Sequence, residues 1–507
     1  MLLRLRRPVA ALSLLLWLNT CVSVRQQPAS EVIQPDRTVT EKIVGVTLND
    51  GRQIRFDQKS EVVITNDSLW TLVGHQSFHV PVSDVQRVWV ERVNKTKTTI
   101  AVLGLALAVV AIIGAASGGD DPPSNSTCCT ESCPFIYSWD GKQYVFDGEP
   151  YGGAISRGLE RDDYSRLEHL RPDASGAYRL LVTNEVPETQ YTNSMRLVVV
   201  DHAPGARFEM DEWGKLHNVT KAVAPASARD QEGRDLVRWL RSTDELIWEP
   251  LPSANPSAAV RQEIILTFPK PRAATRASLV AHAGTGTWGS HMIREFLELR
   301  GPTVSQWYAS LDNATGMSEA LRAWNVREEL YVLKLDVDEA GTWRTRGLLP
   351  GGGPYLTETR VVPLDISAVQ GDSIRVRIRP PNGFWALNSF EMAFDDGDQP
   401  SAVTILEPSK ARTSDARDVL ADLRAVDDRY YTMPTTGNQA EVTFAAPPQR
   451  ANSERSVFVH SRGYYKLHLP ENSAGDAATL QRITDEPDAA ARLAAQRFAS
   501  WRVARGN

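Results

Sequence analysis

An uncharged, mostly aliphatic stretch at residues 98–119 divides this chain into two parts. In a helix with a rise of about 1.5 Å per residue, about twenty apolar residues cross the hydrocarbon core of a bilayer. Polar sequence with the character of folded domains lies on both sides of the stretch. The chain is therefore predicted to contain a small unit, an apolar helix of transmembrane character and a larger unit.

Residues 1–21 have the organisation of an export signal. Arginines precede an apolar core at residues 9–18, and Cys21 follows it. The tetrapeptide Leu18-Asn19-Thr20-Cys21 resembles the box at which bacterial lipoproteins are cleaved and acylated, although threonine is bulkier than the usual residue before the cysteine. An acyl chain on Cys21 would hold the protein on a membrane, since each buried methylene contributes about 0.8 kcal/mol. The alternative is an ordinary cleaved signal, or an uncleaved anchor, in which Cys21 only closes the apolar run.

The charges around the apolar stretch conflict with the export signal. If the signal exports residues 22–97, a helix that spans the membrane at residues 98–119 returns the rest of the chain to the cytoplasm. Lysines before the stretch and aspartates after it instead place its N-terminal side in the cytoplasm. Either the stretch is a hairpin or packed helix that does not span the membrane, or it spans the membrane and one of the charge signals indicates the wrong orientation. Its small residues would also allow self-association within a membrane.

The cysteines favour an oxidising compartment. Three of the four cysteines, Cys128, Cys129 and Cys133, cluster just after the apolar stretch, and none follows Cys133. We expect a local disulfide to Cys133, with one spare thiol that could crosslink protomers. Three thiolates of a zinc site are the alternative, but a fourth ligand is lacking nearby.

Composition argues against nucleic acid as a partner, because the net charge is −6 and basic residues form no stripe. The sequence also lacks a nucleophile elbow, paired metal histidines, a phosphate loop and a cysteine–histidine constellation. We therefore predict a protein that is not an enzyme and has no cofactor or metal. The rival is a hydrolase of envelope polysaccharide, since glycosidases need only two carboxylates; Asp395 and Asp396 are the candidate pair.

A small β unit is predicted at residues 41–94. Alternating residues flank Asn49-Asp50-Gly51, and an Asp-Gly step in this setting is a strong hairpin signal. Three further short strands follow, at residues 62–65, 69–73 and 85–93. This content is typical of a small SH3-like barrel.

The most distinctive motif runs from Cys133 to Glu149 and reads CPFIYSWDGKQYVFDGE. Its aromatic residues alternate with polar or small ones on both sides of Asp140-Gly141, which predicts a hairpin with its aromatic rings on one face. The motif opens a β-rich domain predicted at residues 128–222. It resembles an uncharacterised group of bacterial envelope proteins with lipoprotein character. The resemblance implies an envelope location and a β-rich ectodomain, and it implies no activity.

Strict alternation predicts a β-sandwich-like region at residues 260–470. Ile374, Val376 and Ile378 alternate with arginines, so each strand has one buried and one wet face. In carbohydrate-binding sandwiches an exposed tryptophan stacks on a sugar ring, and Trp343 and Trp385 are the candidates here. The alternative is that both tryptophans fill the edge of the core.

Few helices are predicted. Short ones are expected at residues 235–241 and 289–299. At residues 487–505 a C-terminal helix presents Ala490, Leu493, Ala494, Phe498 and Trp501 on one face. We expect this face to dock on the sandwich; the alternative is that the helix lies on an anionic membrane surface.

Residues 263–289 and 440–469 echo each other. Each has a Thr-Phe pair, a loop with proline, an arginine, a short strand, a glycine and then an aromatic residue. Duplication would make them two related hairpins, and convergent β patterning is the alternative.

Taken together, the sequence predicts a mainly β protein, with a small SH3-like barrel, an apolar helix and then β-sandwich-like domains with few short helices. We expect it to be anchored in the cell envelope with its C-terminal region outside the cytoplasm. Its β-rich ectodomain is expected to bind or scaffold, with the membrane and a glycan or an envelope protein as partners.

Overall fold

The computed structural model describes the chain in two compact units, which divide between Thr127 and Cys128. The described residues are 22–33, 42–49, 53–56, 62–65, 68–73, 76–93 and 134–504, except 245, 254, 256, 395–399, 401 and 471–473. Several predictions lie outside them: the signal at 1–21, the apolar helix at 98–119, Cys21, Cys128, Cys129, Cys133, Asp395 and Asp396. Across the described segments, no helix has the length and apolar character needed to span a bilayer.

The smaller unit forms two open sheets. Its strands are β1 (Val22–Pro28), β2 (Ile43–Leu48), β3 (Gln53–Arg55), β4 (Val63–Thr65), β5 (Ser68–Val73), β6 (Gln76–Pro81) and β7 (Val85–Val93), with the short helices α2 (Ala29–Val32) and η1 (Val82–Asp84). The sheets have the orders β1-β7-β2-β3 and β4-β5-β6. The predicted hairpin on either side of Asn49-Asp50-Gly51 is confirmed, because Thr47 pairs with Gln53. The predicted SH3-like barrel is not formed by the described strands, since β1 and β2 occupy both edges of β7 and leave no edge for β6.

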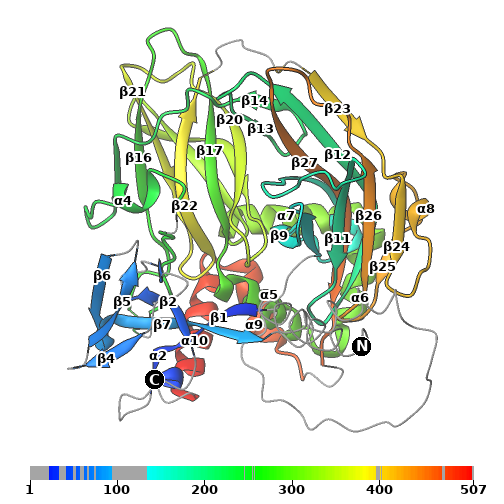
Figure 1. The fold of residues 1–507 in the computed structure, drawn as a ribbon. Coiled ribbons are helices and arrows are strands. Elements are labelled where there is room, and N and C mark those ends of the chain that lie inside the picture. The colour runs from blue at the N-terminus through cyan, green and yellow to red at the C-terminus, as the bar shows by residue number, and fades with distance from the viewer. Residues whose placement is uncertain are drawn as a thin grey trace. The chain divides into compact units, whose positions relative to one another are not determined.

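The larger unit is built around two β-sandwiches, as predicted (Figure 1). The first sandwich packs the sheet β24-β26-β11-β8-β9 against the sheet β10-β27-β12-β23, and β25 also pairs with β12. Its strands are β8 (Phe135–Trp139), β9 (Tyr144–Gly148), β10 (Arg161–Arg166), β11 (Ala177–Thr183), β12 (Glu188–His202), β23 (Ala402–Leu406), β24 (Lys410–Thr413), β25 (Tyr431–Met433), β26 (Gln439–Ala445) and β27 (Glu454–Leu467). Leu180 and Val442 of one sheet meet Leu197 and Val459 of the other in a buried core.

The second sandwich packs the sheet β15-β16-β21-β18-β19 against the sheet β20-β17-β22. Its strands are β15 (Ser227–Asp230), β16 (Ile264–Pro269), β17 (Arg276–Thr285), β18 (Val332–Glu339), β19 (Thr342–Pro350), β20 (Glu358–Asp365), β21 (Ser373–Ile378) and β22 (Trp385–Ala393); a small hairpin of β13 (Phe208–Met210) and β14 (Leu216–Asn218) precedes them. The predicted alternation is confirmed, because Ile374, Val376 and Ile378 are fully buried in its core.

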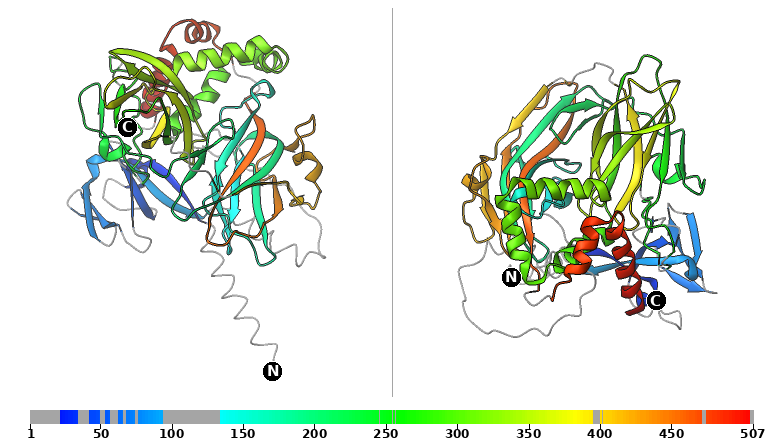
Figure 2. Two further views of the ribbon diagram at one scale, coloured as in Figure 1. Left: turned by 90° about the horizontal axis from the view of Figure 1, so that it is seen from above. Right: turned by 180° about the vertical axis from the view of Figure 1, so that it is seen from behind.

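Most helices lie beside the second sandwich, whereas the short helix at residues 420–423 packs on β12 and β24 of the first. They are α4 (Val237–Leu240), α5 (Thr287–Glu298), α6 (Val304–Asn313), α7 (Thr315–Glu328), α8 (Leu420–Leu423), α9 (Ala477–Asp485) and α10 (Ala489–Ala504), with the 3-10 turns η2 (Arg157–Leu159) and η3 (Gly301–Thr303). The predicted helices at 235–241 and 289–299 correspond to α4 and α5, whereas α6 and α7 were not predicted. Figure 2 shows α5 to α7, in green, close to α9 and α10, in red.

The two sandwiches repeat one strand arrangement. In both, a hairpin (β8–β9 or β18–β19) extends a five-stranded sheet, and a long strand (β27 or β17) takes the centre of the facing sheet. Residues 228–244 and 411–427 align without a gap and share seven identities: Ala228/Ala411, Arg229/Arg412, Arg234/Arg417, Asp235/Asp418, Leu240/Leu423, Arg241/Arg424 and Asp244/Asp427. Both segments make the same strand, turn and short helix, so an internal duplication is present.

The repeated parts pair out of sequence order. Strands β8 to β12 join β23 to β27 in the first sandwich, while β15 to β17 join β18 to β22 in the second, which is inserted between them. The first sandwich therefore crosses the predicted domain ranges 128–222 and 260–470. The echo between residues 263–289 and 440–469 corresponds to β16–β17 and β26–β27. These pairs are not the hairpins that we expected, because the two strands of each pair lie in different sheets.

Candidate functional site

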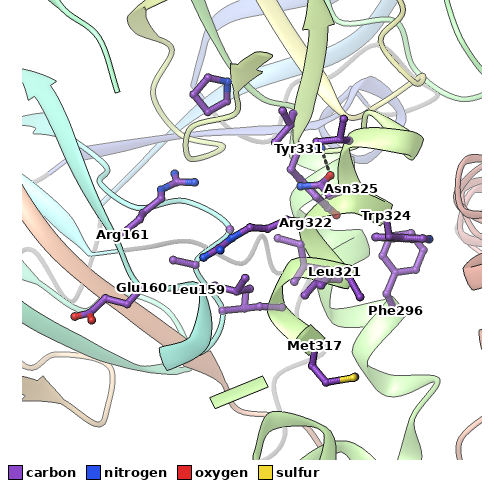
Figure 3. A pocket seen from close by; sticks show the side chains of 18 of the residues that line it. Leu159, Glu160, Arg161, Phe296, Met317, Leu321, Arg322, Trp324, Asn325 and Tyr331 are labelled. Atoms are coloured by element: carbon purple, nitrogen blue, oxygen red, sulfur yellow. Dashed lines mark hydrogen bonds between the residues drawn. The ribbon is translucent and has the colours of Figure 1, made fainter. Parts of the chain in front are cut away.

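A cavity of about 790 Å³ lies in the larger unit, where α5, α6 and α7 meet strands of both sandwiches (Figure 3). The first sandwich contributes β10 and the turn η2, and the second contributes residues of β18, β19 and β20. The turn between β13 and β14 also reaches the lining. Binding cavities for small molecules typically have volumes of about 300 to 1,000 Å³, so this one has the size of a ligand site.

Helices supply most of the apolar lining. The helical residues of this lining include Ile293, Phe296, Leu297, Met317, Leu321, Trp324, Leu480 and Ile483. The rings of Phe296 and Trp324 are perpendicular with centroids 6.1 Å apart, and the Trp324 Nε1–H donates to the Ile483 carbonyl at 2.8 Å. That bond satisfies the polar atom of the indole and leaves its apolar body to the cavity. Figure 3 shows both rings at one end, opposite Glu160 and Arg161.

Ion pairs occupy the other end of the cavity. Arg360 Nη1 lies 2.6 Å from Asp163 Oδ1, and its Nη2 lies 2.5 Å from Glu358 Oε2. Burial opposes ionisation of Asp163, but the guanidinium groups of Arg360 and Arg161 hold its pKa below the ordinary value. Asp163 belongs to β10 and Arg360 to β20, so this buried pair joins the two sandwiches at the wall of the cavity.

Glu149, the last residue of the aromatic motif, holds a loop beside this network. Its Oε2 accepts a hydrogen bond from the Tyr355 backbone N–H at 3.0 Å. A Cβ at Gly353 would lie 1.8 Å from the Glu149 carboxyl carbon, so only glycine fits there. Burial raises the pKa of Glu149 well above its ordinary value, and the nearby Glu358 adds to the rise. The motif thus fastens a loop of the second sandwich to the first.

Two arginines of the lining have no carboxylate partner among the described residues. Arg300 follows α5, and its guanidinium carbon lies 4.0 Å from the centre of the Trp307 ring. Burial lowers the pKa of Arg300 to about 10, so it stays charged at neutral pH. Arg322 of α7 makes one long hydrogen bond, 3.4 Å from Nη2 to the Gly158 carbonyl. Figure 3 shows its side chain running from α7 toward the chain segment of Leu159.

Trp213 is the most exposed large apolar side chain of the described residues, at 80%, and it belongs to the lining. It lies in the turn between β13 and β14. Asp211 Oδ1 fixes this turn by accepting from the Trp213 and Lys215 backbone N–H groups at 3.0 and 2.9 Å. A tryptophan placed in a turn, where a core position is not expected, is the signal that the sequence analysis missed.

The two tryptophans proposed for sugar stacking lie elsewhere. Trp385 is only 1% exposed, and its Nε1–H donates to the Glu329 carbonyl at 3.0 Å, which confirms the alternative that it fills the core. Trp343 is half-buried, and the guanidinium carbons of Arg375 and Arg377 lie 5.2 and 4.7 Å from its ring centre. Because the arginines occupy a face of that ring, it is a poor platform for a sugar.

One arrangement outside the cavity has the residue types of a hydrolase. His217 Nε2 lies 2.8 Å from Asp211 Oδ2, and His217 Nδ1 lies 3.3 Å from Ser278 Oγ. The carboxylate would hold the proton on Nε2, leaving Nδ1 to accept from the serine. However, Asp211 also organises the turn of Trp213, and Ser278 lies within β17 rather than on an exposed turn. The chain of bonds therefore serves to dock the β13–β14 hairpin on β17.

Comparison with known proteins identifies no relative. No family model matches the chain, and no curated protein matches its sequence. Among solved structures, a GH31 α-xylosidase from Xanthomonas citri is 10% identical with a TM-score of 0.16; the match covers 87% of this chain and 37% of the xylosidase. A triple jelly-roll protein of an archaeal virus turret is 8% identical with a TM-score of 0.15, over 69% of this chain and 99% of that one. Likenesses this slight carry no argument about fold or function.

Proposed function

We propose that this protein is anchored in the cell envelope and that its larger unit binds a small, largely apolar molecule without catalysing a reaction. The cavity of about 790 Å³ carries this proposal. It combines a largely apolar lining with charged groups, most of which form ion pairs at one end, and an apolar lining with some polar groups is usual for a small-molecule site. The aromatic face of Trp213 extends the apolar surface into solvent.

The envelope location rests on the sequence. Residues 1–21 resemble an export signal with Cys21 as a candidate for acylation, and residues 98–119 have transmembrane character. The motif at residues 133–149 resembles envelope proteins. In cells whose outer barrier is opened while the inner membrane stays intact, we expect added protease to digest residues 134–504. Protection until the inner membrane is lysed would contradict a location outside the cytoplasm.

The binding proposal is tested with Nile red, an uncharged apolar dye. We expect saturable binding by the wild type and at least tenfold weaker binding by Ala320→Trp, because the indole would occupy the cavity that Ala320 lines. Ala323→Trp is the matched control: Ala323 is exposed on the same helix, α7, and is not part of the lining. Absent binding by the wild type, or equal losses in both variants, would contradict the proposal.

Hydrolysis is the second candidate function. Its carboxylate pair Asp395 and Asp396 lies outside the described residues, and the chain of Ser278, His217 and Asp211 is the observation that favours it. A fluorophosphonate probe labels activated serines. We expect no labelling, because Ser278 is not part of the cavity lining. Labelling of the wild type that disappears in Ser278→Ala would favour a hydrolase.

A further inference from the structure

The charges of the cavity do not balance locally. Its lining contains five arginines and four carboxylates: Arg161, Arg300, Arg322, Arg360 and Arg462, with Glu160, Asp162, Asp163 and Glu212. Arg360 is committed to Asp163 and Glu358. Arg462 is committed to Asp162 at 2.7 Å and to Glu160 at 3.4 Å. These pairs neutralise one another and stabilise the contact between the strands.

Arg161 lies 3.5 Å from Asp163 Oδ2, which leaves Arg300 and Arg322. Neither makes an ion pair with a carboxylate in the part of the chain that the structure describes. Arg300 is partly buried, and a charged group that leaves water normally gains an opposite charge, because desolvation of an unpaired ion costs several kcal/mol. Arg322 is exposed where it lines the cavity. Stacking of Arg300 on Trp307 offsets only part of that cost. Both side chains face a cavity, so the missing negative charge can come from a ligand.

Glu212 is the carboxylate of the lining that makes no ion pair with a described residue, and it would repel an anion. Burial raises the pKa of Glu212, and the neighbouring Asp211 and Asp163 add to the rise while arginines oppose it. Two arginines without a carboxylate partner, Arg300 and Arg322, therefore stand against one such carboxylate, Glu212, whose negative charge is disfavoured. The balance of unpaired charge in the cavity is positive.

We propose, building on the function proposed above, that the bound molecule is an anionic amphiphile: a hydrocarbon chain that lies against Phe296 and Trp324, with a carboxylate or phosphate head that Arg300 and Arg322 bind. The apolar lining from α5 and α7 accommodates the chain. Guanidinium groups suit the head, because they donate several parallel hydrogen bonds to planar carboxylates and to phosphates.

The test compares ligands that share a chain and differ in the head. Binding of dodecanoate, dodecyl phosphate, 1-dodecanol and dodecyltrimethylammonium is measured by displacement of Nile red from the full-length protein. We expect the better anionic ligand to bind about tenfold to a hundredfold more tightly than 1-dodecanol, as for a charge-assisted hydrogen bond. The stronger of the two anionic ligands identifies the head as carboxylate or phosphate.

Variants show which residues cause the preference for an anionic head. Arg300→Gln and Arg322→Gln should each reduce the preference for the anionic head, Arg300→Lys should retain part of it, and Glu212→Gln should strengthen it. Arg272→Gln, at an exposed position away from the cavity, should leave it unchanged. Each variant is first shown to bind Nile red like the wild type, which separates a lost head contact from a lost fold.

The outcomes distinguish this inference from the proposed function. If 1-dodecanol and both anionic ligands bind equally, the cavity is a binding site but the anionic head is wrong. Tighter binding of dodecyltrimethylammonium, lost in Glu212→Gln, would also overturn the inference and favour a cationic head. If neither Nile red nor any of the chains binds, the proposed function fails and the inference with it.

Discussion

Gly233 and Ala416 occupy the same position in the two copies of one turn, before α4 and before α8. Both adopt a left-handed backbone, with φ of 79° and 66°. Their N–H groups donate to the equivalent carbonyls of Asp230 and Thr413, each at 3.0 Å. Glycine adopts this conformation without strain, whereas alanine brings its Cβ too close to the backbone.

Exchanging glycine and alanine at these two positions should therefore have opposite effects on the stability of the fold. Ala416→Gly is expected to raise the free energy of unfolding by about 1 kcal/mol, and Gly233→Ala to lower it by a similar amount. Urea denaturation of the purified larger unit measures both. A loss of stability in Ala416→Gly would mean that the entropy of the unfolded glycine outweighs the relief of strain.

His282 is a second residue whose burial has a measurable consequence. Its ring nitrogens lie 3.1 Å from Thr359 Oγ1 and 3.0 Å from Thr357 Oγ1. Burial lowers the pKa of His282 from 6.5 to about 4, so the folded state favours the neutral ring. The unfolded state takes up a proton at a higher pH than the folded state does.

The stability that neutral His282 contributes is present above pH 6.5 and is lost as the pH falls toward 4. We expect the wild type to lose up to about 3 kcal/mol more than His282→Gln over this interval, since one pKa unit corresponds to about 1.4 kcal/mol. Urea unfolding at a series of pH values measures the difference. Parallel pH profiles for the two proteins would contradict a neutral, buried His282.

At the scale of elements, helix α10 docks as the sequence predicted. Ala490, Ala494 and Phe498 are buried in the core of the second sandwich. The Phe498 ring packs edge-on against Trp288 of α5 with centroids 5.2 Å apart, and the Trp288 Nε1–H donates to the Ala494 carbonyl at 3.2 Å. The alternative that this face lies on a membrane surface is thereby excluded for the described fold.

Removing the Phe498 ring should show how much this docking stabilises the fold. Phe498→Ala is expected to lower the free energy of unfolding by about 3 to 5 kcal/mol, the usual cost of truncating a buried phenylalanine. Arg497→Ala is the control, because its ion pair with Glu295 is partly exposed and worth about 1 kcal/mol or less. Tryptophan fluorescence follows both unfolding curves. Equal effects in the two variants would contradict the docked arrangement.

At the scale of the whole larger unit, the duplication explains a discontinuous architecture. The second sandwich is inserted into the first, between β12 and β23. These two strands are themselves paired neighbours, with Asp201 opposite Ala402. The chain therefore leaves the first sandwich and re-enters it at adjacent positions, as domain insertions usually do.

This geometry predicts that the first sandwich can be made continuous. Replacing residues 202–401 by an Asn-Gly turn should give a protein that folds cooperatively, because Asp201 and Ala402 are then joined by a two-residue hairpin turn and the core of Leu180, Leu197 and Val459 stays complete. Its stability should be lower, since Asp163 loses Arg360. Dispersed amide NMR signals and a single urea transition would be expected; a molten or aggregated product would show that the first sandwich depends on the second.

The sequence by itself determined the local elements of this protein. Alternation fixed the strands of the second sandwich, the Asp-Gly steps fixed two hairpins, and an apolar face at residues 487–505 gave the docking helix, because each depends on neighbours within about ten residues. The tertiary structure decided which strands share a sheet, since equivalent strands of a duplicated chain can pair with either copy. It also decided the cavity. Helix α7 was missed because Met317, Leu321 and Trp324 line a hollow rather than a continuous core, and Trp213 gains its place there only through the fold.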